Sequence, residues 1–222
     1  TIPIESLLSQ KALSLLRNSV ICGVDEAGRG PVLGPLVIAG LTVPDDARLH
    51  MMGVKDSKKL TVKKREMLAA RIREISNAIE VVIINASDID DMRSVMTLNE
   101  IEVHGFAKVI KKLKPDICYI DAADVNETRF GNEIKRYLPK NTQIISKHKA
   151  DNIYPVVSAA SIIAKTRRDQ EVKQIEQELR KRLDLPLGSG YPADPTTQQY
   201  LKTWVETYGK LPPHTRQSWK TA

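Results

Sequence analysis

Two acidic residues stand side by side in the stretch GVDEAGRGPVLGP, where Asp25 and Glu26 come shortly after an apolar run at 20–22. Asp121 closes a second apolar run, ICYID, in a similar way. Either aspartate alone could simply begin a turn, where Asp is common. An ionised carboxylate inside a sheet is costly, however, unless it is paired or bound to a metal. If the two strands are neighbours, a divalent cation would remove the repulsion between the carboxylates, and oxygen ligands suit Mg²⁺ or Mn²⁺.

Two further carboxylates are candidates for the same site. Successive residues of a strand face opposite ways, so Glu26 joins Asp25 only if the strand ends or twists there. The pair Ala27-Gly28 would supply such a break. Asp151 lies in SKHKADNIYPVVSAASIIAK, and Pro155 places the expected helix start a few residues after it. Helix capping, the alternative role for Asp151, is therefore disfavoured.

The glycines after Glu26 do not form a nucleotide-binding fingerprint. GRGPVLG has its third glycine one position late, and it leads into a strand. A dinucleotide fingerprint must open a helix whose N-terminus holds the pyrophosphate. A Walker lysine is also absent from this stretch.

Hydrophobic periodicity indicates the elements that would position the carboxylates. Short segments rich in Val and Ile predict strands at Val20–Asp25, Leu36–Val43, Val81–Asn85, Ile117–Asp121 and Gln143–Ser146. Helices are expected over Val62–Asn77 with Thr61 as cap, Leu98–Lys112, Glu127–Tyr137, Val156 to about Leu183 with Pro155 in the first turn, and Pro195–Tyr208. Gly34-Pro35 predicts a tight turn that pairs the first two strands as a hairpin. Strands that later alternate with helices favour a mixed sheet covered on both faces.

Composition sets outer limits on function. The chain of 222 residues can bury one sizeable core, and 34 Lys and Arg against 27 Asp and Glu give a net charge of +7. That excess favours a polyanionic partner. No apolar stretch approaches the roughly 20 residues that span a bilayer, so no membrane association is expected. The first residues read as an amphipathic helix rather than a secretory signal, so we expect a cytoplasmic protein.

The two cysteines show the same spacing to the two aspartates. Cys22 precedes Asp25, and Cys118 precedes Asp121, by the same interval. If the two strands are parallel neighbours with the aspartates level, the thiols are level too, on the opposite face of the sheet. We therefore expect two adjacent buried cysteines behind the carboxylates.

Several motifs, in order along the chain, resemble those of ribonuclease HII, the type 2 ribonuclease H family, and most of all its archaeal members. They are GVDEAGRGPVLGPLVIAG, VKDSKKL, YIDAAD, HKADNIYPVVSAASIIAK and GSGYPADPTT. The resemblance implies an α/β, ribonuclease H-like five-stranded mixed sheet flanked by helices, with a C-terminal helical extension. The amphipathic start and the change of composition after Leu185 lead us to expect an N-terminal helical extension at 1–18, a catalytic domain at 19–185 and a C-terminal helical region at 186–222.

The same resemblance implies a catalytic site of four metal-binding carboxylates, namely Asp25, Glu26, Asp121 and Asp151. Two divalent ions, Mg²⁺ or Mn²⁺, would activate water and stabilise the leaving 3′-oxygen. Asp25 is the expected bridging ligand; Asp121 and Glu26 would complete one ion and Asp151 the other. The implied enzyme cleaves the RNA strand of RNA–DNA hybrids and cuts 5′ to single ribonucleotides in duplex DNA. It would leave 5′-phosphate and 3′-hydroxyl ends and serve ribonucleotide removal and primer processing.

By the same resemblance, Gly28, Arg29 and Gly30 act with Tyr191 to recognise a ribonucleotide followed by a deoxyribonucleotide. Glycines let backbone groups approach a nucleotide closely, and the 2′-hydroxyl is what distinguishes RNA from DNA. The alternative for Tyr191 is a loop aromatic that packs on the core.

Basic residues are expected to contact phosphates. Lys58 and Lys165 are the two candidates, and a solvated surface lysine is the alternative for each. Ser158 and Ser161 share a helix face with Lys165, which predicts a polar side toward the site. Arg216 and Lys220 in the tail would extend this basic track.

Competing hypotheses come from different classes. Another nuclease of the same fold would share the carboxylates without requiring the glycine loop and Tyr191. A non-catalytic nucleic-acid-binding module would not keep negative charges in a phosphate-binding cleft, because they weaken binding without metal. A structural protein leaves the clustered acids unexplained. We expect a monomer; a sliding clamp is a conceivable partner, although no clamp-binding peptide is visible in the sequence.

Overall fold

The computed structural model describes residues 20–44, 47–54 and 60–220. The helix expected over residues 1–18 and the expected phosphate contact Lys58 lie outside these residues. Among the described helices, none combines the length and the apolar character needed to cross a membrane.

The centre of the fold is the five-stranded mixed sheet that the sequence predicts. Its strands are β1 (Ile21–Ala27), β2 (Leu36–Val43), β3 (Ala78–Ile84), β4 (Ile117–Asp121) and β5 (Gln143–Lys147). Their order across the sheet is β3-β2-β1-β4-β5. β1, β4 and β5 run parallel, whereas β2 is antiparallel to both β1 and β3. β1 is therefore the central strand, and its carboxyl end lies beside that of β4.

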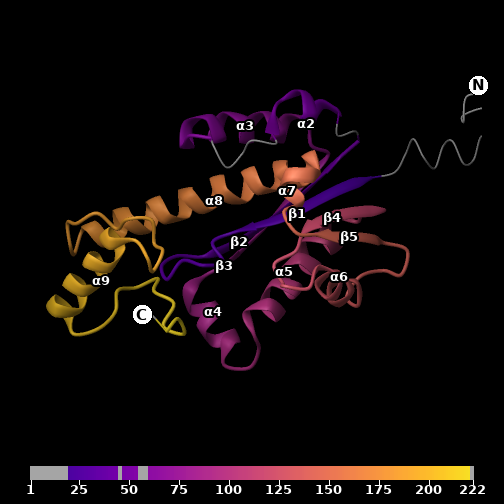
Figure 1. The fold of residues 1–222 in the computed structure, drawn as a ribbon. Coiled ribbons are helices and arrows are strands. Elements are labelled where there is room, and N and C mark those ends of the chain that lie inside the picture. Colours follow the sequence, from indigo (N-terminus) through magenta and orange to yellow (C-terminus); the bar gives the residue numbers. More distant parts are fainter. Residues whose placement is uncertain (1–19, 45–46, 55–59, 221–222) are drawn as a thin grey trace, which may run out of the picture.

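Helices cover both faces of this sheet (Figure 1). They are α2 (Ala47–Met51), α3 (Val62–Ile75), α4 (Ala86–Arg93), α5 (Leu98–Leu113), α6 (Glu127–Lys135), α7 (Ala150–Ile153), α8 (Pro155–Arg180) and α9 (Pro195–Tyr208). α3 and α8 lie on one face, and α5 and α6 on the other. Periodicity does not predict α2, α4 and α7, because helices of 5, 8 and 4 residues carry too few turns to show a repeat.

Two expected helix starts are confirmed. The Thr61 hydroxyl accepts a hydrogen bond from the Lys64 amide at 3.3 Å, which satisfies an N–H in the first turn of α3. Pro155 is the first residue of α8, where its missing N–H costs no intrahelical bond.

The connection between β1 and β2 differs from the tight turn that the sequence predicts. The two strands do pair antiparallel, but an open loop from Gly28 to Pro35 joins them. This loop does not close on itself; the amides of Val32 and Gly34 donate to the carbonyls of Gly190 and His214, at 2.8 and 2.9 Å. Segments remote in sequence therefore determine its shape.

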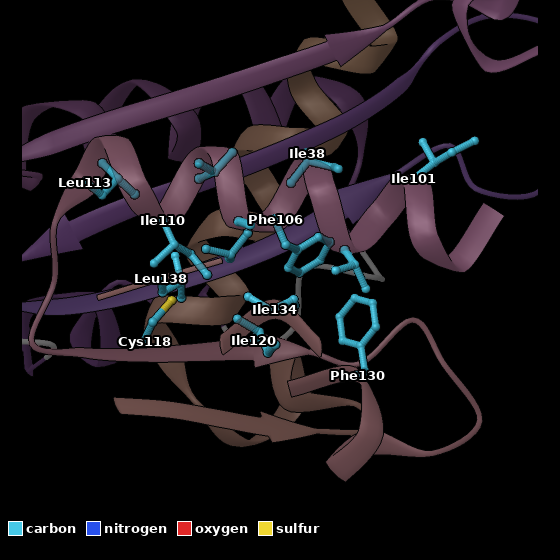
Figure 2. Close-up of a cluster of buried hydrophobic side chains, with 14 of the residues drawn as sticks. Ile38, Ile101, Phe106, Ile110, Leu113, Cys118, Ile120, Phe130, Ile134 and Leu138 are labelled. Atoms are coloured by element: carbon cyan, nitrogen blue, oxygen red, sulfur yellow. The ribbon is translucent and has the colours of Figure 1, made fainter. Parts of the chain in front are cut away.

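One hydrophobic core lies between the sheet and helices α5 and α6 (Figure 2). Phe106 of α5 and Phe130 of α6 meet edge to face there, with ring centroids 5.2 Å apart. A second core packs α3 and α8 against the opposite face of β1 and β2. α8 comes so close that a Cβ on Gly23 would lie 2.3 Å from the Val156 carbonyl oxygen. These two cores fix the central strand from both sides.

The predicted cysteine register is confirmed. Cys22 pairs with Cys118 across the parallel strands β1 and β4, and both are buried free thiols in the core of α5 and α6. Gly23 faces α8 instead, so by strand alternation Asp25 also lies on the α8 face. The thiols therefore lie behind the carboxylates. Burial raises the pKa of Cys118 well above its usual value, and the neighbouring Cys22 adds to this shift.

A third, smaller core joins the C-terminal region to the β1–β2 loop. Val32 and Leu33 of that loop pack with Tyr200 and Trp204 of α9 and with Leu179 of α8. Figure 1 shows α9 beside the far end of α8. The loop after β1 is thus held between the sheet and the C-terminal region.

Candidate active site

Three of the four candidate carboxylates converge. Val24 of β1 pairs with Ile120 of β4, so Asp25 and Asp121 stand one residue further along neighbouring parallel strands. Asp151 reaches the same place from α7, which follows β5. One carboxylate oxygen from each lies within 4.8 Å of the other two. This is a spacing at which oxygen ligands can share a divalent cation.

Burial and mutual repulsion act on this cluster together. Burial raises the pKa of Asp25 well above its usual value, and the charges of Asp121, Glu26 and Asp151 raise it further. The pKa of Asp121 is also raised, first by burial and then by Asp151. Asp25 and Asp121 would thus be easier to ionise with a cation beside them, which fits the donor set to a hard divalent metal.

The start of α7 supports Asp121 in its charged form. Lys149, just before α7, has a left-handed backbone with φ 54°. The backbone amides of Lys149, Ala150 and Asp151 donate to the Asp121 carboxylate and partly offset the rise in its pKa. α7 therefore both supplies one carboxylate and orients another.

Glu26 lies outside the three-carboxylate cluster. The expected strand break after Asp25 does not occur, since β1 continues to Ala27. The Glu26 amide donates to Asp25 Oδ1 at 2.7 Å, while the buried Glu26 Oε2 has no hydrogen-bond partner among the described residues. Burial raises the pKa of Glu26 to about 7; Arg29 opposes this shift and Asp121 adds to it. An unpaired buried oxygen next to the cluster leaves Glu26 as a candidate fourth ligand.

This shift predicts a pH dependence of stability in metal-free protein. The folded state raises the pKa of Glu26 from 4.5 to about 7, so the folded state binds the proton more tightly than the unfolded one. Stability is therefore lost as pH rises through this window, by about 3 kcal/mol for Glu26 alone. Denaturant unfolding in chelator, below and above this window, measures the loss. Glu26→Gln should flatten the profile, and identical profiles for variant and wild type would contradict the shift.

Next to the carboxylates lies a cavity of about 570 Å³. Glu26 lines it, together with the loop residues Gly28, Arg29 and Gly30 and with Lys165 and Tyr191. A slightly larger hollow of about 650 Å³, between α4 and the C-terminal segment, lies away from the carboxylate cluster. The chemistry of the lining, rather than volume, makes the first cavity the candidate substrate site.

Gly28 is sterically required in the loop, and Gly30 is closely packed there. Gly28 has φ 93°, and a Cβ there would lie 2.3 Å from Nε of Arg168. A Cβ on Gly30 would lie 3.2 Å from the ring of Tyr191. The loop and the tyrosine therefore form one closely packed wall of the cavity, and larger residues would push them apart.

The segment carrying Tyr191 is held by Asp194. Its carboxylate accepts hydrogen bonds from the amide and hydroxyl of Ser189, both at 2.7 Å, and from the Thr196 amide at 2.9 Å. These bonds lower the pKa of Asp194 to about 2. Tyr191 itself remains 47% exposed and can be contacted from the cavity. Its packing on the core, the alternative from sequence, does not describe a ring this accessible.

The Arg29 side chain has partners on α5. It forms an ion pair with Glu102, which is fully buried, and donates to Asn99 at 2.6 Å. Glu102 was not among the sequence-based candidates, because its position within the helical pattern of α5 carries no motif. The pairing ties the loop to the opposite face of the sheet from α8.

Two sequence expectations about polar residues are wrong. Arg216 does not extend an exposed basic track; it is fully buried and donates to backbone carbonyls of the β1–β2 loop. Ser158 does not face the site, since its hydroxyl is buried and bonds to the Val54 carbonyl. Ser161 is also buried and does not line the cavity, whereas Lys165 does. Helical spacing places Ser158, Ser161 and Lys165 on one face of the helix, but it does not show which neighbouring segments cover that face.

A five-stranded mixed sheet with β2 antiparallel, and an acidic cluster where β1 and β4 end, defines a nuclease of the ribonuclease H class. Within that class, the family model for ribonuclease HII matches residues 22–222. This chain belongs to the ribonuclease HII family. It is a ribonuclease H enzyme, an endoribonuclease that acts on RNA paired with DNA, as the motifs in its sequence predict.

Individual relatives agree with this assignment. The ribonuclease HII of Methanosarcina barkeri is 48% identical over 213 residues, which cover 91% of this chain and 93% of the relative. The structure of ribonuclease H2 from Pyrococcus horikoshii matches with a TM-score of 0.84 at 40% identity, covering 91% of this chain and 95% of that one. The ribonuclease HII in a complex with PCNA from Archaeoglobus fulgidus matches with a TM-score of 0.83, also at 40% identity, over 90% and 95%. The archaeal likeness expected from the motifs is confirmed.

Proposed function

We propose that this enzyme cleaves the RNA strand of RNA–DNA hybrids and also cuts 5′ to single ribonucleotides embedded in duplex DNA. The products would carry 5′-phosphate and 3′-hydroxyl ends, and the role would be ribonucleotide removal and primer processing. The observation that carries the proposal is the contiguity of the carboxylate cluster with the cavity of the glycine loop and Tyr191, joined through Glu26.

The donor set supports two divalent ions, Mg²⁺ or Mn²⁺. Asp25 feels the charges of all three other acids and is the proposed bridging ligand; Asp121 and Glu26 would complete one ion and Asp151 the other. Ions bound there would supply charge stabilisation for the attacking water and the leaving 3′-oxygen. The protein's own contribution is to hold the carboxylates in place before substrate arrives.

The cavity lining supports the choice of substrate. Glycine backbone at Gly28 and Gly30 admits a sugar closely, and the exposed ring of Tyr191 offers a surface for the sugar that follows. Lys165 lines the same cavity and is proposed to contact a phosphate; Lys58 stays a prediction.

A sliding clamp is a second proposed partner. It is supported by the Archaeoglobus fulgidus protein, which is 40% identical and was solved in complex with PCNA. The monomeric state remains a prediction.

The proposed function is tested with a DNA duplex that contains one ribonucleotide. We expect cleavage on its 5′ side in Mg²⁺ or Mn²⁺, and none in excess chelator. End-labelled products, sized against synthetic markers, locate the cut. A requirement for four consecutive ribonucleotides would contradict the single-ribonucleotide proposal while leaving hybrid cleavage intact.

A further inference from the structure

Arg216 of the C-terminal segment binds the loop that follows β1 through hydrogen bonds. Its guanidinium donates to three backbone carbonyls, those of Gly28 at 2.6 Å, Arg29 at 3.0 Å and Gly34 at 3.0 Å. Its own amide donates to the Val32 carbonyl at 2.8 Å. One buried side chain thus fixes both ends of the glycine stretch.

Arg168 of α8 holds the same loop from the other side. It is 8% exposed, and it donates to the carbonyls of Leu33 at 3.1 Å and Pro35 at 3.3 Å. Trp219 donates to the Gly30 carbonyl at 3.2 Å. Carbonyls along the loop therefore have donors on the protein side.

The backbone amides at the centre of the loop, unlike the carbonyls, are without hydrogen-bond partners among the described residues. In the described parts of the chain, the backbone amides of Arg29 and Gly30 have no hydrogen-bond acceptor. Both residues line the cavity beside Glu26 and Tyr191. The loop carbonyls thus accept hydrogen bonds from protein side chains. The amides of Arg29 and Gly30 remain able to donate to a substrate hydroxyl or phosphate in the cavity.

We propose that Arg216 and Arg168 are positioning residues for ribose recognition. They hold the loop carbonyls inward so that the amides of Arg29 and Gly30 stay directed at the substrate. The inference rests on the proposed function, because it assumes that the loop reads a ribonucleotide. It also assigns a role to the C-terminal segment, which becomes part of the specificity apparatus without touching the substrate.

Only arginine suits this place. Its planar fork presents five donors in fixed directions, whereas the ammonium of lysine is a compact point charge. Arg216→Lys keeps the charge but cannot reach the carbonyls of Gly28, Arg29 and Gly34 together. The carbonyls left without donors would then reorient toward solvent or toward the cavity.

Steady-state cleavage of two substrates by Arg216→Lys tests the proposal. For the duplex with one ribonucleotide, we expect a loss of kcat/KM of about 10- to 100-fold, mainly through KM. For a uniform RNA–DNA hybrid the loss should be smaller, because ribose is offered at every position. Arg180→Lys, at an exposed arginine that pairs with Glu176, is the control and should match wild type on both substrates.

Amide hydrogen exchange provides a readout that does not depend on activity. In Arg216→Lys, the amides of Val32 and Gly34 should exchange faster, while those in the middle of α8 keep wild-type rates. Unchanged loop exchange, or equal loss on the two substrates, would overturn the positioning role. Failure of wild type to cut the single-ribonucleotide duplex would instead overturn the proposed function, and loop exchange would still decide whether Arg216 holds the loop.

Discussion

Asp121→Asn is expected to reduce cleavage of an RNA–DNA hybrid by roughly 10³-fold or more. The substitution turns one of three carboxylates, whose nearest oxygens lie within 4.8 Å of one another, into a neutral amide, which is a weaker donor to a divalent cation. Bound metal ions contribute several kcal/mol of transition-state stabilisation, and each 1.36 kcal/mol is about tenfold in rate. Single-turnover cleavage in saturating Mg²⁺ or Mn²⁺ measures the loss.

The same variant should not be less stable than wild type when metal is absent. Burial and Asp151 raise the pKa of Asp121, so folding disfavours its charged form relative to the unfolded chain. A neutral amide avoids that penalty, although it loses part of the favourable interaction with the α7 amides. Denaturant unfolding in chelator makes the comparison.

Asp124 offers a matched control close in sequence. It is buried, as Asp25 and Asp151 are, but Arg129 pairs with it at 2.6 and 2.8 Å, and this pairing lowers its pKa, whereas the pKa of Asp121 is raised. Asp124→Asn should therefore keep most of the activity and lose some stability. Undiminished turnover by Asp121→Asn, or equal losses for the two variants, would defeat the metal assignment.

The carboxylate cluster can be predicted from the sequence because its signals are local. An aspartate at the end of an apolar run marks a strand end, and strands of similar make-up pair in one sheet. The strand register can be predicted from the cysteines. Cys22 and Cys118 have the same spacing to Asp25 and Asp121, so on parallel neighbouring strands each cysteine pairs with the other when the aspartates are level. These inferences need only strand alternation and the pattern of apolar residues.

The residues that hold the loop cannot be predicted in this way, because their partners are remote in sequence. Arg216 bonds to residues almost the whole domain away, and an arginine near a chain end is ordinarily a solvated residue. Arg168 and Glu102 sit in long helices whose periodicity gives no sign of a buried charge. The prediction of a tight turn at Gly34-Pro35 is wrong for the same reason, because hydrogen bonds to Gly190 and His214 determine the shape of the loop.

The substrate requirement gives the second large expected effect. If backbone donors of the glycine loop bond a 2′-hydroxyl, a duplex made only of DNA leaves them unpaired. Sites built to bind a hydroxyl reject the analogue without it by about 10⁴-fold or more. All-DNA duplex should therefore be resistant to the enzyme under conditions in which a single embedded ribonucleotide suffices for cleavage.

Tyr191→Ala should cut cleavage at an embedded ribonucleotide by roughly 10- to 100-fold and leave the fold intact. The ring packs against Gly30 and is 47% exposed, so its removal widens the cavity without opening a core. Tyr137→Ala is the matched control: Tyr137 is 43% exposed and contacts His104, away from this cavity. Full activity of Tyr191→Ala would show that the tyrosine does not read the sugar. Cutting of all-DNA duplex by wild type would show that neither the loop nor the tyrosine selects for the 2′-hydroxyl.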